Sequence, residues 1–190
     1  MADHTTYGLV CSELSEDLSK TNLGELKLDS FQDNSVQIKI KAASLNFPDL
    51  LMTQGKYQNR PDLPFALGME GAGIVEKVGS GVSSFKEGDE VMFGGWGHGA
   101  IAESIILPEG LVSLKPKSLN FSEAASFKTA YLTAYVGLIR RGELKQGETL
   151  LVHGASGGVG MAAVQMGKLY GAKVIASGTS DEKLKIVKTW

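Results

Sequence analysis

In the first part of the chain, hydrophobic and polar residues alternate in short runs, a pattern typical of β-strands. Residues 36–42 alternate strictly, which predicts a strand with one buried face. Three further strands are expected over residues 71–78, 89–93 and 102–107, with glycine or proline at their ends. Because the strands are short and separated by turn residues, we expect a partly open barrel or sandwich.

Near residue 120 the spacing of apolar residues changes to that of helices. Ser122 is expected to cap a short helix, and a second helix is expected over residues 129–141, which end in two arginines before a glycine. An apolar strand over 149–153, a helix over 161–170 and a second strand over 173–177 then follow. The second part of the chain is therefore predicted to be α/β.

Length and composition set limits on the organisation. We expect a β domain in residues 1–121, followed in residues 122–190 by linking helices and the first strand–helix–strand unit of a second domain. With 43% hydrophobic and 21% charged residues, the composition is that of a globular protein. The net charge of −2 gives no basic surface for nucleic acid. Because Cys11 is the single cysteine, a disulfide framework and a multi-cysteine zinc site are excluded.

The sequence carries neither a secretion signal nor a membrane anchor that we can identify. Residues 1–6 lack a basic segment followed by an apolar core. No apolar run is long enough to span a bilayer. We therefore expect a cytoplasmic protein without membrane contact.

The turn between the strand at 149–153 and the following helix is rich in glycine. A pyrophosphate requires backbone N–H groups at a helix N-terminus, with no side chain in the way. The turn fits the dinucleotide fingerprint with alanine at the first position, and its context of strand, turn, helix and strand is the required one. The alternative is a turn that only packs the helix on the sheet. The candidate cofactor-binding residues are Ala155, Ser156, Gly157, Gly158, Val159 and Gly160.

The end of the second strand indicates the type of dinucleotide. A cofactor with a free ribose 2′-hydroxyl usually meets an acidic residue about 20 residues after the turn. Ser177 and Thr179 occupy this region, and Lys183 follows one turn later. This set suits a 2′-phosphate and favours NADPH. In the alternative, Asp181 or Glu182 is the missing acid, or both are ordinary acids of a first helical turn.

Four ordered blocks of residues carry a family resemblance: 43–49 (ASLNFPD), 68–73 (GMEGAG), 78–82 (VGSGV) and the glycine turn. On these blocks the chain resembles the zinc-independent quinone oxidoreductases of the medium-chain dehydrogenase/reductase superfamily, the zeta-crystallin group. The resemblance implies a GroES-like, partly open β-barrel domain followed by a Rossmann domain, a doubly wound parallel sheet that is incomplete here. It also implies an active site in the cleft between the domains.

The resemblance also predicts that the enzyme works without metal. The three positions that hold the catalytic zinc in zinc-dependent relatives correspond to Asn46, Met69 and Thr129 in this chain. None of these residues is a suitable zinc ligand. The cysteine-rich lobe of the relatives cannot exist with Cys11 alone. We therefore expect a zinc-free reductase.

The resemblance implies roles for several residues in hydride transfer from NADPH to a flat acceptor, a quinone or an enone. Asn46 and Asp49 would orient the acceptor or the nicotinamide carboxamide, Tyr57 would line the pocket or donate a hydrogen bond, and Thr133 would contact the nicotinamide. The alternative for Asn46 and Asp49 is a capped turn after the strand. Tyr57, like the other aromatic residues nearby, has core packing as its alternative. These other aromatic residues are Phe47 and Phe65. His153, which lies beside the glycine turn, is also expected to be a packing residue.

Two rival interpretations remain open. The chain could be an NADPH-dependent reductase of enals, enones or enoyl thioesters, which would share the cofactor. It could instead be a non-catalytic nucleotide-binding or structural fragment, because a complete dinucleotide domain needs about six strands and the sequence predicts only the first strands. We expect that residues 1–190 are the amino-terminal part of a longer protein, which the resemblance implies to be a homodimer.

Overall fold

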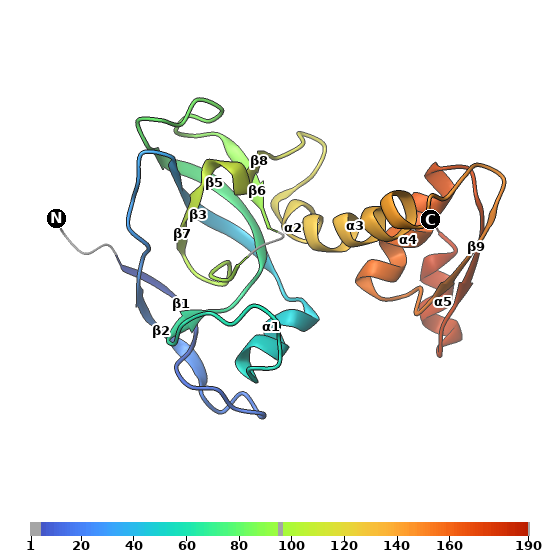
Figure 1. Ribbon diagram of the computed structural model, residues 1–190, viewed down its shortest axis with the longest axis horizontal. Coiled ribbons are helices and arrows are strands. Elements are labelled where there is room, and N and C mark those ends of the chain that lie inside the picture. Colours follow the sequence, from blue (N-terminus) through green and yellow to red (C-terminus); the bar gives the residue numbers. More distant parts are fainter. Residues whose placement is uncertain (1–4, 95–96, 190) are drawn as a thin grey trace. The chain divides into compact units, whose positions relative to one another are not determined.

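The computed structural model describes residues 5–94 and 97–189 and divides the chain into two compact units, Met1–Lys128 and Thr129–Trp190. Figure 1 shows the first unit in blue to yellow and the second in orange to red. Residues 1–4, part of the stretch in which we expected no secretion signal, lie outside the described residues. Each unit is described by itself below.

The first unit is built from two antiparallel sheets. A three-stranded sheet has the order β2-β1-β4, and a five-stranded sheet has the order β7-β3-β5-β6-β8. A bridge from Gly8 to Ala102 links β1 to the segment before β7. The strands are β1 (Thr5–Cys11), β2 (Thr21–Lys27), β3 (Ser35–Ser44), β4 (Phe65–Ala66), β5 (Glu70–Val78), β6 (Glu90–Phe93), β7 (Ser104–Pro108) and β8 (Val112–Leu114).

The largest buried cluster of the first unit is built on the five-stranded sheet. Val36 and Ile38 of β3 are fully buried there and pack with Val75 of β5 and Val91 of β6. Val36 and Ile38 belong to the alternating pattern that predicted β3, and Val75 and Val91 lie in the strands expected over residues 71–78 and 89–93. The predicted strand over 102–107 is also present, as β7.

The short helix near residue 120 is α2 (Phe121–Ala125), and its cap differs from the prediction. Asn120, not Ser122, is the N-cap: its Oδ1 accepts from the Glu123 N–H at 2.9 Å, and Glu123 Oε2 accepts from the Asn120 N–H at 2.8 Å. The prediction chose the wrong residue because asparagine and serine are both favoured N-cap residues, and the sequence offers one of each within three positions. Ala124 of α2 packs with Ala72 of β5, so α2 belongs to the first unit although the sequence division at 121/122 assigns it to the second.

The second unit begins in the following helix. This helix consists of α3 (Lys128–Tyr135) and a π-helical turn (Val136–Arg141).

Besides α2, the first unit contains the helix α1 (Phe47–Thr53) and a 3-10 turn (Glu109–Leu111).

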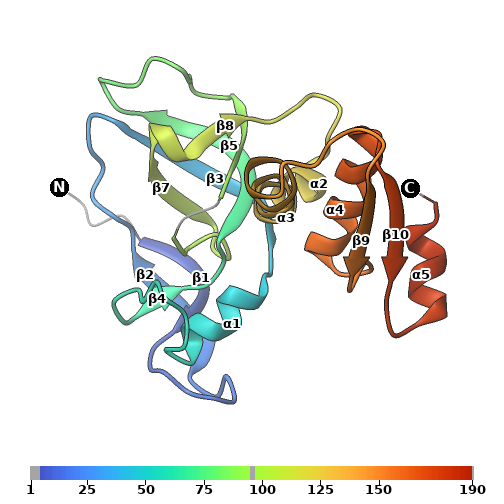
Figure 2. The ribbon, with the colours of Figure 1, turned by 45° about the vertical axis from the view of Figure 1, so that its right-hand side comes forward.

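The rest of the second unit is a single strand–helix–strand unit with one more helix. The strands β9 (Thr149–His153) and β10 (Lys173–Ser177) are parallel neighbours, with α4 (Gly158–Leu169) between them in sequence and α5 (Asp181–Val187) after them. Figure 2 shows the two arrows running in the same direction. Val152 of β9 packs with Ala162 and Ala163 of α4. The strands β9 and β10 have the predicted bounds, and α4 begins three residues before and ends one residue before the predicted helix over 161–170.

Candidate functional site

The glycine turn brings the start of α4 very close to the end of β9. A Cβ atom on Gly160 would lie 2.3 Å from the Gly154 carbonyl oxygen and 2.8 Å from the Ala155 Cα. Gly154 itself has φ of +61°, a left-handed conformation that favours glycine. Ala155 is fully buried and its N–H donates to the Ser177 carbonyl oxygen at 3.0 Å. The sequence therefore needs small residues here for backbone packing.

The outer side of the same turn is open. A Cβ atom on Gly158 would meet no atom within 4 Å. The N–H groups of Gly158, Val159 and Gly160 are the first three of α4, so they have no acceptor within the helix. A hollow of about 550 Å³ adjoins them, lined by residues from the π-helical turn, β9, the glycine turn and α4. An anion at this position would meet unpaired N–H groups and the positive end of the helix dipole.

The ends of β9 and β10 hold a polar pair that the sequence did not predict. His153 and Ser177 are direct partners in the parallel register, and His153 Nδ1 lies 2.8 Å from Ser177 Oγ. His153 is exposed, so its predicted packing role is wrong. Thr179 and Lys183 are exposed beyond the strand end, and no acidic residue precedes Asp181 in this loop. The strand ends and the first turn of α5 therefore carry hydroxyl groups (Ser177, Thr179), an imidazole (His153) and an amino group (Lys183), in the region where the sequence analysis expects the ribose.

Thr133 lies on the exposed side of α3. Its Oγ1 donates to the Thr129 carbonyl oxygen at 2.6 Å. The hydroxyl hydrogen is thus used within the helix, which leaves the oxygen lone pairs to accept a hydrogen bond.

In the first unit, Asn46 and Asp49 form the N-terminus of α1. Asp49 is 1% exposed. Its Oδ2 accepts from the Asn46 N–H at 2.7 Å, and its Oδ1 accepts from the Gly68 N–H at 3.2 Å. Both carboxylate oxygens therefore bond to backbone, the arrangement expected for a capped turn. Burial raises the pKa of Asp49, backbone hydrogen bonds oppose this, and the negative charge of Glu70 adds to the increase.

Asn46 joins this turn to the sheet. Its Nδ2 donates to Glu70 Oε1 at 2.9 Å. Glu70 is the first residue of β5 and is 1% exposed, whereas Asn46 is half-buried. The sequence analysis quoted Glu70 in a family block but gave it no role. In the sequence, Glu70 is the one charged residue in the run 65–75, and this was the signal that could have marked it.

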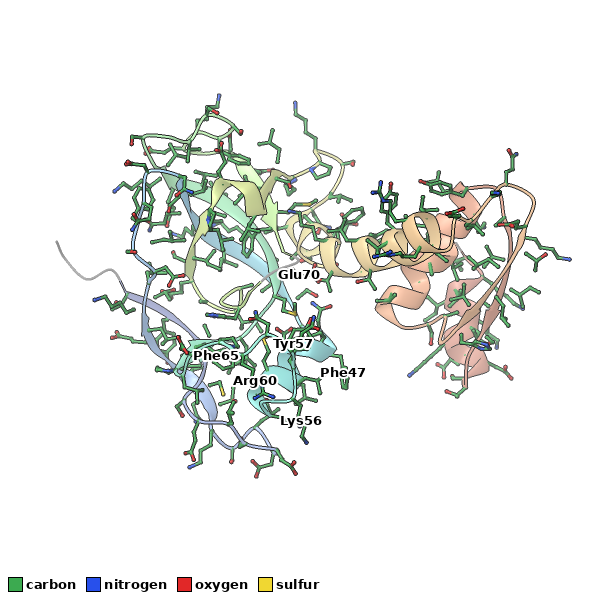
Figure 3. The ribbon with its side chains drawn as sticks, in the orientation of Figure 1. Phe47, Lys56, Tyr57, Arg60, Phe65 and Glu70 are labelled. Atoms are coloured by element: carbon green, nitrogen blue, oxygen red, sulfur yellow. The ribbon has the colours of Figure 1, made fainter. Side chains whose placement is uncertain are left out.

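The aromatic residues around α1 divide into two kinds (Figure 3). Phe65 is 2% exposed and belongs to the core, as its packing alternative expected. Phe47 is 71% exposed, which rules out the core alternative for this residue. Leu45, the residue before Asn46, is also 71% exposed. Tyr57 is half-buried and packs against the cluster that contains Phe65.

The positions related to metal ligands differ in their surroundings. Met69 is buried in the cluster of Met52 and Cys11, and Asn46 bonds to Glu70. In residues 5–94 and 97–189 no three His, Cys, Asp or Glu side chains gather in a way that could hold a metal ion. Within the same residues no helix is long and apolar enough to cross a membrane.

Comparison with known proteins gives a consistent set of relatives. Residues 32–117 match the alcohol dehydrogenase GroES-like domain. The human protein named quinone oxidoreductase is 38% identical over 156 residues, which cover 82% of this chain and 47% of that protein. The crystal structure of Escherichia coli quinone oxidoreductase complexed with NADPH has 32% identity and a TM-score of 0.84, covering 98% of this chain and 56% of that one. The CurK enoyl reductase structure has 31% identity and a TM-score of 0.86, covering 97% and 57%.

These findings confirm the fold class: a GroES-like β domain followed by part of a Rossmann-type domain. They also confirm the resemblance to quinone oxidoreductases of the medium-chain dehydrogenase/reductase superfamily. The chain spans about half the length of the curated relatives it matches, 47% of the human protein.

Proposed function

We propose that this chain supplies the acceptor-binding and pyrophosphate-binding parts of an NADPH-dependent, zinc-free oxidoreductase that reduces a quinone or another conjugated carbonyl compound. The observation that carries the proposal is the glycine turn, which is closed toward the strand at Gly160 and open toward solvent at Gly158. This geometry leaves helix N–H groups free for a diphosphate. Nicotinamide supplies a hydride when bound, and the side chains of this chain bind and orient the reactants.

Three groups support NADPH as the dinucleotide. The Ser177 hydroxyl is oriented by His153, Thr179 is exposed beside it, and the Lys183 amino group is exposed on α5. Hydroxyl donors and a cation stabilise a 2′-phosphate, whereas a carboxylate would repel it. Thr133 Oγ1 has its hydrogen committed to Thr129, so we assign it as an acceptor for the carboxamide N–H of the nicotinamide.

The surface around Asn46 suits a flat, conjugated acceptor. Leu45 and Phe47, the residues before and after the half-buried Asn46, both expose apolar side chains. An amide N–H can donate to the carbonyl oxygen on which negative charge develops during hydride addition. We assign this role to Asn46, with Tyr57 as part of the wall of the site. Asp49, whose two oxygens bond to backbone, holds the turn in shape.

The dinucleotide assignment is tested by titration of the chain with NADPH and NADH. We expect tighter binding of NADPH, and Lys183→Ala should weaken NADPH binding by about tenfold while leaving NADH binding unchanged. Lys185→Ala is the matched control, because Lys185 is an exposed lysine of the same helix. Equal loss for both dinucleotides, or an equal effect of both variants, would contradict the 2′-phosphate assignment.

The reaction is tested by NADPH oxidation with a panel of quinones, enones and enoyl thioesters. Turnover with quinones supports the primary proposal. Turnover restricted to enoyl thioesters would favour the second candidate, a reductase of activated alkenes, which the similarity to the CurK enoyl reductase supports. NADPH binding without turnover of any acceptor would leave the chain as a binding module and would refute the proposed activity for these 190 residues.

A further inference from the structure

Glu70 occupies an unusual position for a carboxylate. It is the first residue of β5, it pairs with Ser44 of β3, and it is 1% exposed. Taking a carboxylate out of water is costly, and hydrogen bonds to the charged group offset the cost. One such bond comes from Asn46 Nδ2, 2.9 Å from Glu70 Oε1 and 24 residues away in the sequence.

The chemistry of this bond fixes the orientation of the Asn46 amide. Because Asn46 Nδ2 donates to Glu70 Oε1, the amide turns its nitrogen toward Glu70 and its oxygen away from it. The nitrogen carries two hydrogens, and among the described residues Glu70 is its one hydrogen-bond acceptor. The second hydrogen of Asn46 Nδ2 is therefore available to a ligand, in a direction set by the first.

The packing around Glu70 fixes the position of its backbone and Cβ atom. Gly94 lies so close that a Cβ atom built on it would be 2.6 Å from the Glu70 Cβ. On the other side, β3 pairs along the length of β5. The backbone of Asn46 is in turn held by Asp49 Oδ2 at 2.7 Å. Both partners of the Asn46–Glu70 bond are thus attached to rigid structure.

We infer that Glu70 is a positioning residue that holds the Asn46 amide with one Nδ2 hydrogen directed at the carbonyl oxygen of the acceptor. The effect on turnover rests on the proposed function, whereas the orientation of the amide does not. Glu70 does not touch the acceptor. It acts by removing the rotational freedom of the amide and by preventing the amide from turning its oxygen toward a substrate carbonyl, which would be repulsive.

The orientation is tested by NMR on the ¹⁵N-labelled chain, with the Asn46 side-chain resonance identified by its loss in Asn46→Ala. Glu70→Met removes the acceptor at similar side-chain length, Glu70→Gln keeps a neutral acceptor, and Glu70→Asp withdraws the charge by one methylene. We expect the hydrogen-bonded Nδ2 proton to move upfield in Glu70→Met and to move less in the other two variants. Glu76→Met, on an exposed residue of β5, should leave it unchanged.

The same variants are then assayed for NADPH oxidation with 2-methyl-1,4-naphthoquinone. We expect kcat to fall by about tenfold or more in Glu70→Met with KM for NADPH unchanged, because a misplaced donor affects the reacting centre. Glu70→Gln should recover most of the loss. Adding Glu70→Met to Asn46→Ala should cause no further loss, since the two residues act as one unit.

Two results would overturn the inference. One is an Asn46 resonance that is the same in Glu70→Met and Glu70→Asp as in the wild type. The other is a loss of kcat in Glu70→Met that adds fully to the loss in Asn46→Ala. If the wild type turns over no acceptor, the proposed function fails, and the Asn46 resonance still decides whether Glu70 sets the amide. If Glu70→Met does not fold, Glu70→Asp, which shortens the side chain by one methylene, takes its place, and Glu70→Gln remains the variant that keeps an acceptor.

Discussion

The two sides of the glycine turn should respond in opposite ways to an added methyl group. In Gly160→Ala the new Cβ would lie 2.3 Å from the Gly154 carbonyl oxygen and 2.8 Å from the Ala155 Cα. Both are backbone atoms, so the turn has to open, and we assign this overpacking a cost of about 1–3 kcal/mol. In Gly158→Ala the methyl group would meet nothing within 4 Å.

Both variants share the gain from a stiffer unfolded chain, about 0.4–1 kcal/mol for glycine to alanine. We therefore expect Gly160→Ala to lower the free energy of unfolding by about 1–2 kcal/mol. We expect Gly158→Ala to leave it unchanged or to raise it by up to about 1 kcal/mol. The difference between the two variants isolates the steric cost. Urea unfolding followed by circular dichroism gives the free energies, and hydrogen exchange in α4 shows that the change lies in the second unit.

Dinucleotide binding should follow the other order. The methyl group of Gly158→Ala would occupy the open space beside the first N–H groups of α4, where we place the pyrophosphate. NADPH affinity should fall by about tenfold or more, which corresponds to ~1.4 kcal/mol, in a protein of undiminished stability. If Gly158→Ala binds NADPH as the wild type does, the pyrophosphate does not lie at this turn. If Gly160→Ala is as stable as Gly158→Ala, the close packing described here is incorrect.

Three further predictions concern the first unit. Asn120→Ala should lower the free energy of unfolding by about 1 kcal/mol because the cap of α2 is lost, whereas Ser122→Ala should have no measurable effect; the thermal midpoints of both variants check this. Burial raises the pKa of Asp49 in the folded chain above its ordinary value of 3.8. Protonation of Asp49 therefore contributes to the free energy of unfolding; this contribution is fully present below pH 3.8 and is lost as the pH rises through the folded-state pKa. The unfolding free energy of the wild type should therefore decline relative to that of Asp49→Asn over this pH range, and parallel curves would contradict the assignment. Lys56→Ala should leave the thermal midpoint unchanged, because the Lys56–Glu16 pair at 2.9 Å is largely exposed; a clear loss that persists at high salt would refute this.

Local patterns were sufficient for several elements. The strict alternation over residues 36–42 predicted β3, and the run from 149 to 177 predicted β9, α4 and β10, because each pattern lies within one element or its immediate neighbours. The strand β1 was missed. Its buried positions include Thr6 and Gly8, which do not form an apolar alternation. Gly8 is required because a Cβ atom there would lie 2.5 Å from the Ile101 carbonyl oxygen, far away in the sequence.

The candidate site shows the same division. The turn of Asn46 and Asp49 is local, and the sequence correctly offered a capped turn as one of its alternatives. The contact of Asn46 with Glu70 and that of His153 with Ser177 depend on pairing between strands and on the packing of α1. No spacing in the sequence encodes these contacts, because their partners are 24 residues apart in both cases.

The sequence alone predicted the strands β3, β5, β6, β7, β9 and β10, the helix α4 and the glycine turn, because each of these depends on residues close to one another in the chain. The tertiary structure decided which side of the turn is closed and which is open. It also decided that the Asp49 carboxylate accepts hydrogen bonds from backbone N–H groups, that Phe47 is exposed and that Asn46 donates to Glu70. Those properties follow from burial and strand register, which exist only once distant segments pack together.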